Sequence, residues 1–192
     1  MKRTLLVLSM LYSACALAAS GPQAINNATI DASGQQYLGN LTVNQAAGDQ
    51  QQQVNSRAIA IGTEASASNR IRQHSWTVVD PTLDATSSIQ GNAFTNGNGA
   101  LGVNQSSGAS NQQANALRIS ISAKPQSIDD SVLDQQNVAL LISSEATDQN
   151  PGSRQVVTSD QAFTGSSGVI QLNQSAGVGN QMANTLSVRV VD

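Results

Sequence analysis

Cysteine and aromatic residues are both scarce in this sequence. It contains one cysteine, Cys15, and aromatic side chains make up only 3% of its 192 residues. A single cysteine excludes an internal disulfide, and few aromatic side chains argue against a large compact core. The stability of the fold must then have another source, such as extended pairing of the backbone.

Charge is scarce as well, since only 11% of the residues are charged. Asp and Glu outnumber Lys and Arg by 12 to 9, which gives a net charge of −3 at pH 7. Nucleic-acid binding needs clusters of basic side chains, so this balance argues against a nucleic-acid partner. Asn, Gln, Ser, Gly and Ala dominate instead. Such amide-rich, charge-poor sequences are typical of proteins that associate through β-structure.

Residues 1–18 have the pattern of a secretory signal peptide. Lys2 and Arg3 form a basic start, an apolar stretch follows, and Ala16-Leu17-Ala18 resembles a small-residue cleavage site. Cleavage there would remove Cys15, so we expect a secreted protein without cysteine. The alternative, a chain lipidated at Cys15, is disfavoured because residues 11–14 fit a lipoprotein signal poorly.

One unit of 23 residues occurs three times and aligns without a gap. Its copies are GNLTVNQAAGDQQQQVNSRAIAI at 39–61, GALGVNQSSGASNQQANALRISI at 99–121 and GVIQLNQSAGVGNQMANTLSVRV at 168–190. Six columns are identical in all three copies. They hold Gly39, Gly99 and Gly168; Asn44, Asn104 and Asn173; Gln45, Gln105 and Gln174; Gly48, Gly108 and Gly177; Gln52, Gln112 and Gln181; and Asn55, Asn115 and Asn184.

Each copy predicts two strands joined by an arc. Apolar residues recur at every second position on both sides of the arc glycines Gly48, Gly108 and Gly177. This period indicates half-buried strands, and glycine can take the positive φ of a tight arc without steric cost. One copy buries too few apolar side chains to offset the entropy of ordering its backbone. We therefore predict an all-β fold in which three strand-arc-strand repeats stack as a β-solenoid or cross-β block. The alternative is a row of independent hairpins.

The identical amides gain a role in such a stack. Copies lying about 4.8 Å apart would let each Asn or Gln bond to its equivalents above and below. The charged residues of the unit occupy different columns in the three copies, so like charges would not meet. We predict that the twelve Asn and Gln residues of the identical columns form ladders for self-assembly.

The rest of the chain has a different composition. We expect a lead-in at 19–38, repeats at 39–62, 93–122 and 159–192, and irregular spacers at 63–92 and 123–158. Inside the spacers, residues 76–79 and 138–142 are apolar runs that would each add a strand. Residues 127–136 fit a short helix.

The sequence contains no motif for catalysis, for a metal or for a cofactor. His74 is the single histidine and has no partner for a zinc site or a catalytic triad. We interpret the aspartates of the spacers as solubilising charges because they lack calcium-loop spacing; they are Asp80, Asp84, Asp129, Asp130 and Asp134. For Trp76, which lies near Arg70 and Arg72, we expect a packed aromatic rather than a sugar-binding patch. We therefore expect no enzymatic activity, no metal and no cofactor.

The string GVNQSSGASNQQAN at 102–115 resembles the repeat of the Fap functional amyloids, which are extracellular fibre subunits of Gram-negative biofilms. Members of that family also carry a signal peptide and three imperfect repeats joined by two unequal spacers. The similarity extends from about residue 28 to the end of the chain. It implies self-assembly into fibrils, export through an outer-membrane secretion pore, and a place outside the cell.

Within that family the chain is more similar to the minor, nucleating type of subunit. The major type usually ends in Cys-x-x-Cys and often has a long second spacer, whereas this sequence ends in Val190-Val191-Asp192. The resemblance then implies two partners, further copies of the chain and the major subunit. Two alternatives stay open: the major subunit itself, and a monomeric secreted β-solenoid that acts as an adhesin or binds carbohydrate.

Overall fold

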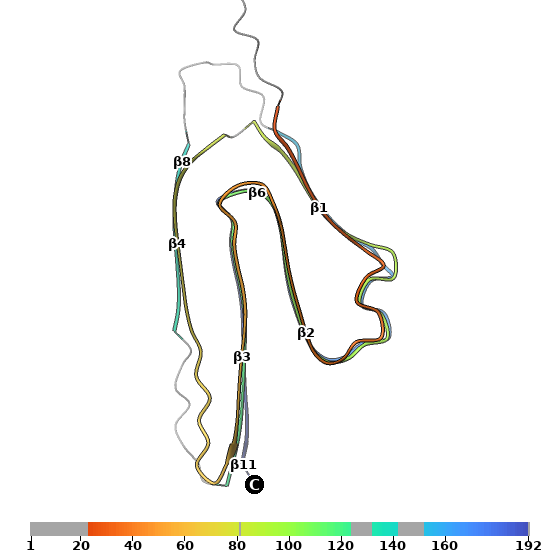
Figure 1. The fold of residues 1–192 in the computed structure, drawn as a ribbon, viewed down its shortest axis with the longest axis vertical. Coiled ribbons are helices and arrows are strands. Elements are labelled where there is room, and N and C mark those ends of the chain that lie inside the picture. The colour runs from red at the N-terminus through yellow and green to blue at the C-terminus, as the bar shows by residue number, and fades with distance from the viewer. Residues whose placement is uncertain (1–22, 81, 124–131, 142–151, 192) are drawn as a thin grey trace, which may run out of the picture.

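The computed structural model describes residues 23–80, 82–123, 132–141 and 152–191 (Figure 1). In these ranges every regular element is a β-strand, which confirms the all-β prediction. No helix in this part of the chain has the length and apolar character to cross a membrane. The strands are β1 (Ile25–Asp31), β2 (Leu38–Ala47), β3 (Gln52–Gly62), β4 (Arg70–Val79), β5 (Asp84–Gln90), β6 (Asn98–Ala109), β7 (Gln112–Ser122), β8 (Val132–Leu141), β9 (Arg154–Thr158), β10 (Ser167–Val178) and β11 (Gln181–Val191).

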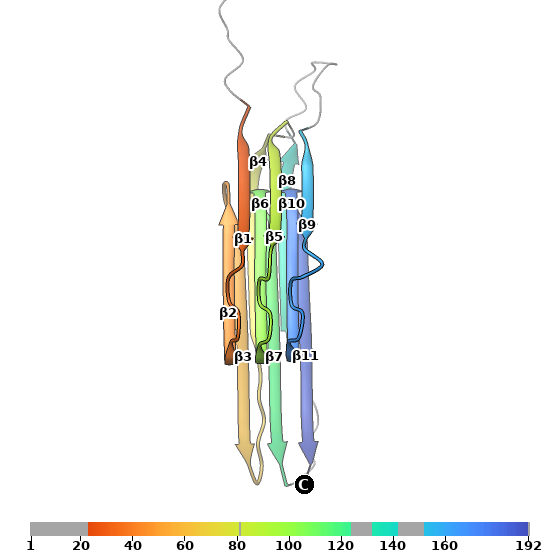
Figure 2. The same ribbon diagram turned by 90° about the vertical axis from the view of Figure 1, so that its right-hand side faces the viewer.

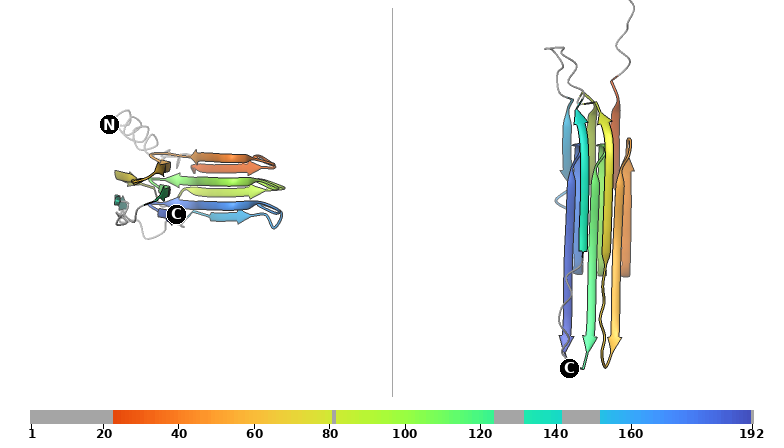
Figure 3. Two further views of the ribbon diagram at one scale, coloured as in Figure 1. Left: turned by 90° about the horizontal axis from the view of Figure 1, so that it is seen from below. Right: turned by 90° about the vertical axis from the view of Figure 1, so that its left-hand side faces the viewer.

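These strands form open sheets in which all neighbours run parallel. One sheet has the order β1-β5-β9, the second β2-β6-β10 and the third β3-β7-β11, while β4 pairs with β8. Figures 2 and 3 show the result as stacked layers, coloured orange, green and blue. We call β1 to β4 layer 1, β5 to β8 layer 2 and β9 to β11 layer 3.

The repeats pair residue by residue across the layers. Gly99 lies between Gly39 and Gly168, and Asn104 lies between Asn44 and Asn173. The second strands of the repeats, β3, β7 and β11, pair in the same way. Because side chains alternate between the two faces of a strand, this register places each residue on the same face as its equivalents.

A hydrophobic core lies between the sheet of β1 and the sheet of β2. Its buried side chains include Ile30, Ile89, Leu101 and Val103. In layer 2, residues 101–109 of β6 are all buried, because layers 1 and 3 cover this strand on both edges. The end layers have one uncovered edge each, and their strands are more exposed.

Rings and glycines of neighbouring layers fit into one another where the repeats begin. Phe94 stacks on Phe163 with the ring centroids 5.4 Å apart. A Cβ added to Gly34 in layer 1 would lie 2.6 Å from the Phe94 ring, and one added to Gly97 in layer 2 would lie 1.8 Å from the Tyr37 ring. Each glycine therefore makes room for a ring of the adjacent layer, and this fixes how layers 1 and 2 stack.

The structure differs from the sequence expectation in the lead-in and the spacers. Strands β1, β5 and β9 lie there and form a sheet of their own. Strands β4 and β8 confirm the added strands at 76–79 and 138–141, whereas residues 132–136 belong to β8 rather than to a helix. Residues 1–18, 127–131 and 142 lie outside the described residues.

Strand β4 packs on the outer face of β3 and β7. From Ile71 to Trp76 its side chains alternate between buried and exposed. The amide of Gln73, on the buried side, donates to the backbone oxygens of Gln52 at 3.1 Å and Gln113 at 3.2 Å. Trp76 lies on the outward side and is 66% exposed, so the expectation of a packed aromatic is wrong.

Candidate self-assembly surface

Three asparagines form a ladder through the first strands of the repeats. Asn104 Nδ2 donates to Asn44 Oδ1 at 3.0 Å, and Asn173 Nδ2 donates to Asn104 Oδ1 at 3.0 Å. Strands β2, β6 and β10 position these side chains, which all point toward the second strand of their own repeat. The ladder therefore connects all three layers through identical contacts.

A second asparagine ladder runs beside the first one. Asn115 Nδ2 donates to Asn55 Oδ1 at 3.0 Å, and Asn184 Nδ2 donates to Asn115 Oδ1 at 3.1 Å. Within each layer the two ladders also meet, at 2.8 Å in layer 1 and 3.0 Å in layers 2 and 3. The asparagines thus tie the two strands of each repeat together as well as the layers.

A glutamine ladder joins the repeats to the sheet of β1. Gln105 Nε2 donates to Gln45 Oε1 at 2.7 Å, and Gln174 Nε2 donates to Gln105 Oε1 at 2.9 Å. Each of these amides also donates to the backbone of the neighbouring sheet, as Gln45 does to Thr29 O at 2.8 Å. The ladder therefore lies between two sheets.

These amides are buried as deeply as a hydrophobic core. Asn104, Gln105, Gln112 and Asn115 are 0% exposed. A buried amide without hydrogen-bond partners costs about 1–3 kcal/mol, so a polar interior is stable only where such bonds are made. The ladders supply them, and each amide depends on its equivalents in the adjacent layers.

The remaining predicted ladder is less complete. Gln112 Nε2 lies 3.4 Å from Gln52 Oε1, and Gln52 Nε2 donates to the backbone oxygen of His74. Gln181, the third member, is exposed on β11. The structure therefore joins layers 1 and 2 through this column, and it places Gln181 at the surface.

Other polar contacts between layers were missed from the sequence. Gln113 Nε2 donates to Gln105 O at 2.9 Å and to Ser175 Oγ at 3.0 Å, and Gln113 Oε1 accepts from Gln53 Nε2 at 3.1 Å. The equivalents of Gln113 are Gln53 in layer 1 and Met182 in layer 3, so a search for columns that are identical in all three repeats does not find this position. A search for similar polar residues would have found two of its three members.

The side chain of Arg57 extends from layer 1 past layer 2 to layer 3. Its guanidinium donates to Asn40 Oδ1 in layer 1 and lies 3.4 Å from Gln171 Oε1 in layer 3. A Cβ on Gly102 would lie 2.5 Å from Arg57 Nη2, so this glycine in layer 2 leaves the passage open. Burial lowers the pKa of the guanidinium. In the register Arg57 lies opposite Leu117, and Arg118 opposite Ala58 and Ser187, so these arginines do not stack on each other.

The arc glycines carry positive φ at each repeat, with values of 100° at Gly48, 110° at Gly108 and 121° at Gly177. Residues other than glycine rarely adopt this backbone conformation. A Cβ on Gly48 would also lie 2.0 Å from the oxygen of Gly108, and one on Gly108 would lie 2.0 Å from the oxygen of Gly177. Both the bend of the arc and the close stacking of the layers therefore require glycine.

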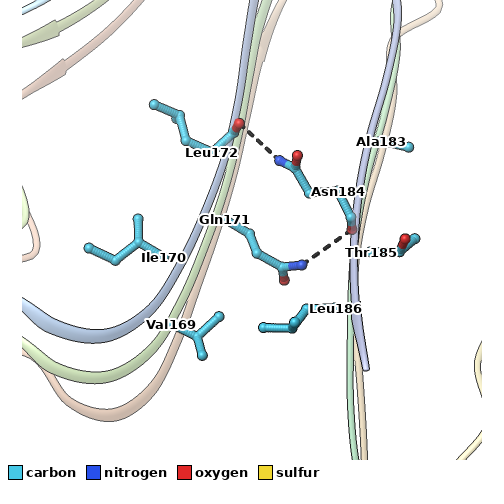
Figure 4. A pocket seen from close by; sticks show the side chains of 8 residues that line it. All are labelled: Val169, Ile170, Gln171, Leu172, Ala183, Asn184, Thr185 and Leu186. Carbon is cyan, nitrogen blue, oxygen red and sulfur yellow. Dashed lines mark hydrogen bonds between the residues drawn. The ribbon is translucent and has the colours of Figure 1, made fainter. Parts of the chain in front are cut away.

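The end layers present open strand edges. Among the described residues no strand pairs with the outer edges of β1, β2 and β3, or with those of β9, β10 and β11. Layer 3 also has a cavity of about 600 Å³ between β10 and β11 (Figure 4). It is lined by Val169, Ile170, Gln171, Leu172, Ala183, Asn184, Thr185 and Leu186.

The spacer residues weighed for chemistry lie apart from the ladders. His74 is exposed on the outward side of β4. Asp80 accepts from the hydroxyl and the backbone N–H of Thr82, and these bonds lower the pKa of its carboxyl. No three His, Cys, Asp or Glu side chains gather within the described ranges. Asp129 and Asp130 lie outside those ranges, and Asp134 is part of β8.

Comparison with known proteins shows similarity to one family. Residues 13–191 match the model of the "Functional amyloid protein FapB/FapC family". A relative from Pseudomonas aeruginosa, named functional amyloid subunit FapC, is 37% identical over 107 residues, which are 51% of this chain and 31% of the relative. The match thus covers about a third of the relative's length. No solved structure matches the chain.

The family match spans the whole described structure, including all the strands and the three amide ladders that connect the layers. The chain belongs to the FapB/FapC family of functional amyloid proteins.

Proposed function

We propose that the protein is a secreted subunit of an extracellular amyloid fibre in a biofilm matrix, and that layer 1 of one copy stacks on layer 3 of another. The observation that supports this most is the residue-by-residue pairing of the three repeats. Because the repeats already stack on one another, a repeat of a second copy fits the open end by the same contacts. The fibre would then be a continuous β-solenoid with cross-β spacing.

Open strand edges support the same proposal. Most proteins cover or shorten such edges, because an open edge pairs with other chains. Here both end layers offer long edges with the same amide columns as the interior. In the fibre, Asn44 of one copy would continue the ladder that ends at Asn173 of the next.

We further propose that the protein is a minor component of the FapB type, which nucleates the major subunit. Its second spacer is only slightly longer than the first, since the repeats start at 39, 99 and 168. The family resemblance instead describes a long second spacer for the major type. Its partners would be further copies of itself, the major subunit and an outer-membrane secretion pore.

Purified mature protein is expected to form thioflavin-positive fibres. Aligned fibres should diffract at about 4.7–4.8 Å, the spacing of paired strands. Fluorescence, electron microscopy and fibre diffraction test this. A chain that stays monomeric for days at high concentration, and does not seed a partner, would contradict the proposal. That outcome would favour the monomeric adhesin.

The nucleating role predicts a second result. A trace amount of the protein should shorten the lag of a purified major subunit, because a preformed stack supplies the template that nucleation lacks. The lag is measured by thioflavin fluorescence with and without the additive. A matched control is the same amount of a Gly108→Val variant, whose layers we expect not to stack. An unchanged lag would assign the chain to the bulk of the fibre instead.

A further inference from the structure

We propose that the two end faces are chemically opposite, so that copies join in one orientation only. In the columns of Asn44, Asn55 and Gln45 the donating ends point toward the face of layer 1 and the accepting ends toward the face of layer 3. In the column of Gln53 and Gln113 the bonds run the opposite way, so this column too has unlike ends. This inference rests on the proposed function, and it specifies which face of a second copy each end accepts.

The direction of the ladder bonds supports it first. In the ladders of Asn44, Asn55 and Gln45, every bond between layers is donated from layer 3 to layer 2 or from layer 2 to layer 1. The bond from Gln112 to Gln52 has the same direction. An amide has a donating and an accepting end, so a ladder with one direction leaves unlike groups at its two ends.

Layer 1 keeps the unused donors. Asn44 is exposed, and among the described residues its Nδ2 donates no hydrogen bond. The Nε2 of Gln45 and the Nδ2 of Asn55 donate only within layer 1. The equivalent amides of layer 2 all donate to layer 1, and those of layer 3 all donate to layer 2.

Layer 3 keeps the unused acceptors of the two asparagine ladders, whereas Gln174 Oε1 accepts from Thr158 Oγ1 at 2.7 Å. Asn104 Oδ1 accepts from Asn115 in its own layer and from Asn173 in the next layer. Asn173 Oδ1 accepts from Asn184 in its own layer and, within the described ranges, from nothing beyond it. Asn184 Oδ1 accepts no bond from a described residue, and Asn184 lines the cavity on this face (Figure 4).

The glycines give an independent indication of the same order. A Cβ on Gly99 would lie 2.0 Å from the oxygen of Gly39, and one on Gly168 would lie 2.1 Å from the oxygen of Gly99. The Cβ position of Gly168 thus faces layer 2, and that of Gly99 faces layer 1. The Cβ position of Gly39 has nothing within 4 Å. It faces the place where layer 3 of a second copy would lie.

The arc glycines point the opposite way. The Cβ positions of Gly48 and Gly108 face the oxygen of the next layer, at 2.0 Å each. The Cβ position of Gly177 therefore faces outward from layer 3, and its nearest neighbour is the side chain of Arg154 at 2.9 Å. A methyl group there would meet the Gly48 oxygen of a second copy.

Joining layer 1 to layer 1 would leave the donors of Asn44, Asn55 and Gln45 without the acceptors that layer 3 supplies, and joining layer 3 to layer 3 would leave those acceptors without donors. Only layer 1 on layer 3 pairs unlike groups and repeats the glycine contacts. The predicted fibre therefore exposes a layer 1 face at one end and a layer 3 face at the other.

Two variants that each damage one face test the inference. Asn44→Asp replaces the free donor of layer 1 by a carboxylate oxygen, yet it can still accept from Asn104 and Asn55. Gly177→Ala places a methyl group on the face of layer 3. Each variant alone is expected to remain monomeric. An equimolar mixture is expected to form a dimer and stop, because it offers one intact junction.

Analytical ultracentrifugation and native mass spectrometry measure these species, and circular dichroism checks the fold of each variant. Exposed changes that spare both faces, Asn98→Asp and Gly62→Ala, serve as controls and should form fibres like the wild type. If Gly177→Ala does not fold, the pair Thr42→Lys and Leu186→Lys replaces the first pair. These positions are exposed, lie on layers 1 and 3 respectively, and need no strained backbone.

Dimers of a single variant, or fibres from the mixture, would overturn the one-way orientation while wild-type fibres form. A wild-type chain that does not assemble would instead contradict the proposed function. The two failures are therefore distinguishable.

Discussion

A Gly108→Val variant is expected to lose both the stacked fold and fibre formation. Gly108 has φ of 110°, and its Cβ position lies 2.0 Å from the oxygen of Gly177. Strained backbone of this kind costs about 1–3 kcal/mol before any clash is counted. The clash is with backbone rather than with a flexible side chain, so the layers can relieve it only by separating.

Circular dichroism and thioflavin fluorescence measure this loss. Gly62→Val is the matched control, because Gly62 is exposed at the end of β3 and an added Cβ meets nothing within 4 Å. If the two variants assembled at equal rates, close stacking at the arc glycines would have no role in the fibre.

An Asn104→Asp variant is expected to be nearly as damaging at neutral pH. Asn104 is 0% exposed, and its Nδ2 donates to Asn44 Oδ1 at 3.0 Å and to Val54 O at 2.8 Å. A carboxylate cannot donate either bond, and it would bring a negative charge against two oxygen atoms. An uncompensated buried charge costs about 3–5 kcal/mol.

The same variant should recover in acid. Burial favours the neutral carboxyl, so its pKa in the folded state lies above that in the unfolded state. The stability lost to the charge is then regained below the unfolded value, about 3.9, and is lost again as the pH rises through the folded value. The neutral carboxyl has one O–H and so replaces only one of the two bonds. Assembly rates measured at pH 3 and pH 7 test this. Asn98→Asp, an exposed position on the same strand, should show no comparable difference between the two pH values.

The register of the repeats could be predicted from the sequence because identical residues recur at fixed spacing. Gly39, Asn44 and Asn55 have equivalents 60 residues later, and the structure pairs each of them at this interval. Apolar residues at every second position predict both strands of each repeat. The role of the ladders in self-assembly stays a prediction.

The sheet of β1 could not be predicted in the same way. Ile25 pairs with Asp84, an interval of 59 residues, whereas the repeats that follow are 60 apart. The loop between β5 and β6 is therefore one residue longer than the loop between β1 and β2, and a gapless alignment ends there. The strand sequences INNATID and DATSSIQ also differ. The two strands share buried residues at the paired positions 28 and 87 and at 30 and 89, and this burial depends on the sheet that packs against them.

The direction of the ladder bonds was also inaccessible to sequence reasoning. An Asn in an alignment column carries no information on which way its amide points. The bonds within each layer, such as that from Asn115 to Asn104 at 3.0 Å, fix this choice. They exist only once the two strands of a repeat face each other.

The one-way ladders have an electrical consequence. Each side-chain amide carries a dipole, and dipoles that point the same way add along the stack instead of cancelling as those of strands do. The sum resembles that of an α-helix, with layer 1 as the positive end and layer 3 as the negative end. A growing fibre would therefore carry an axial field that orients an approaching copy before contact.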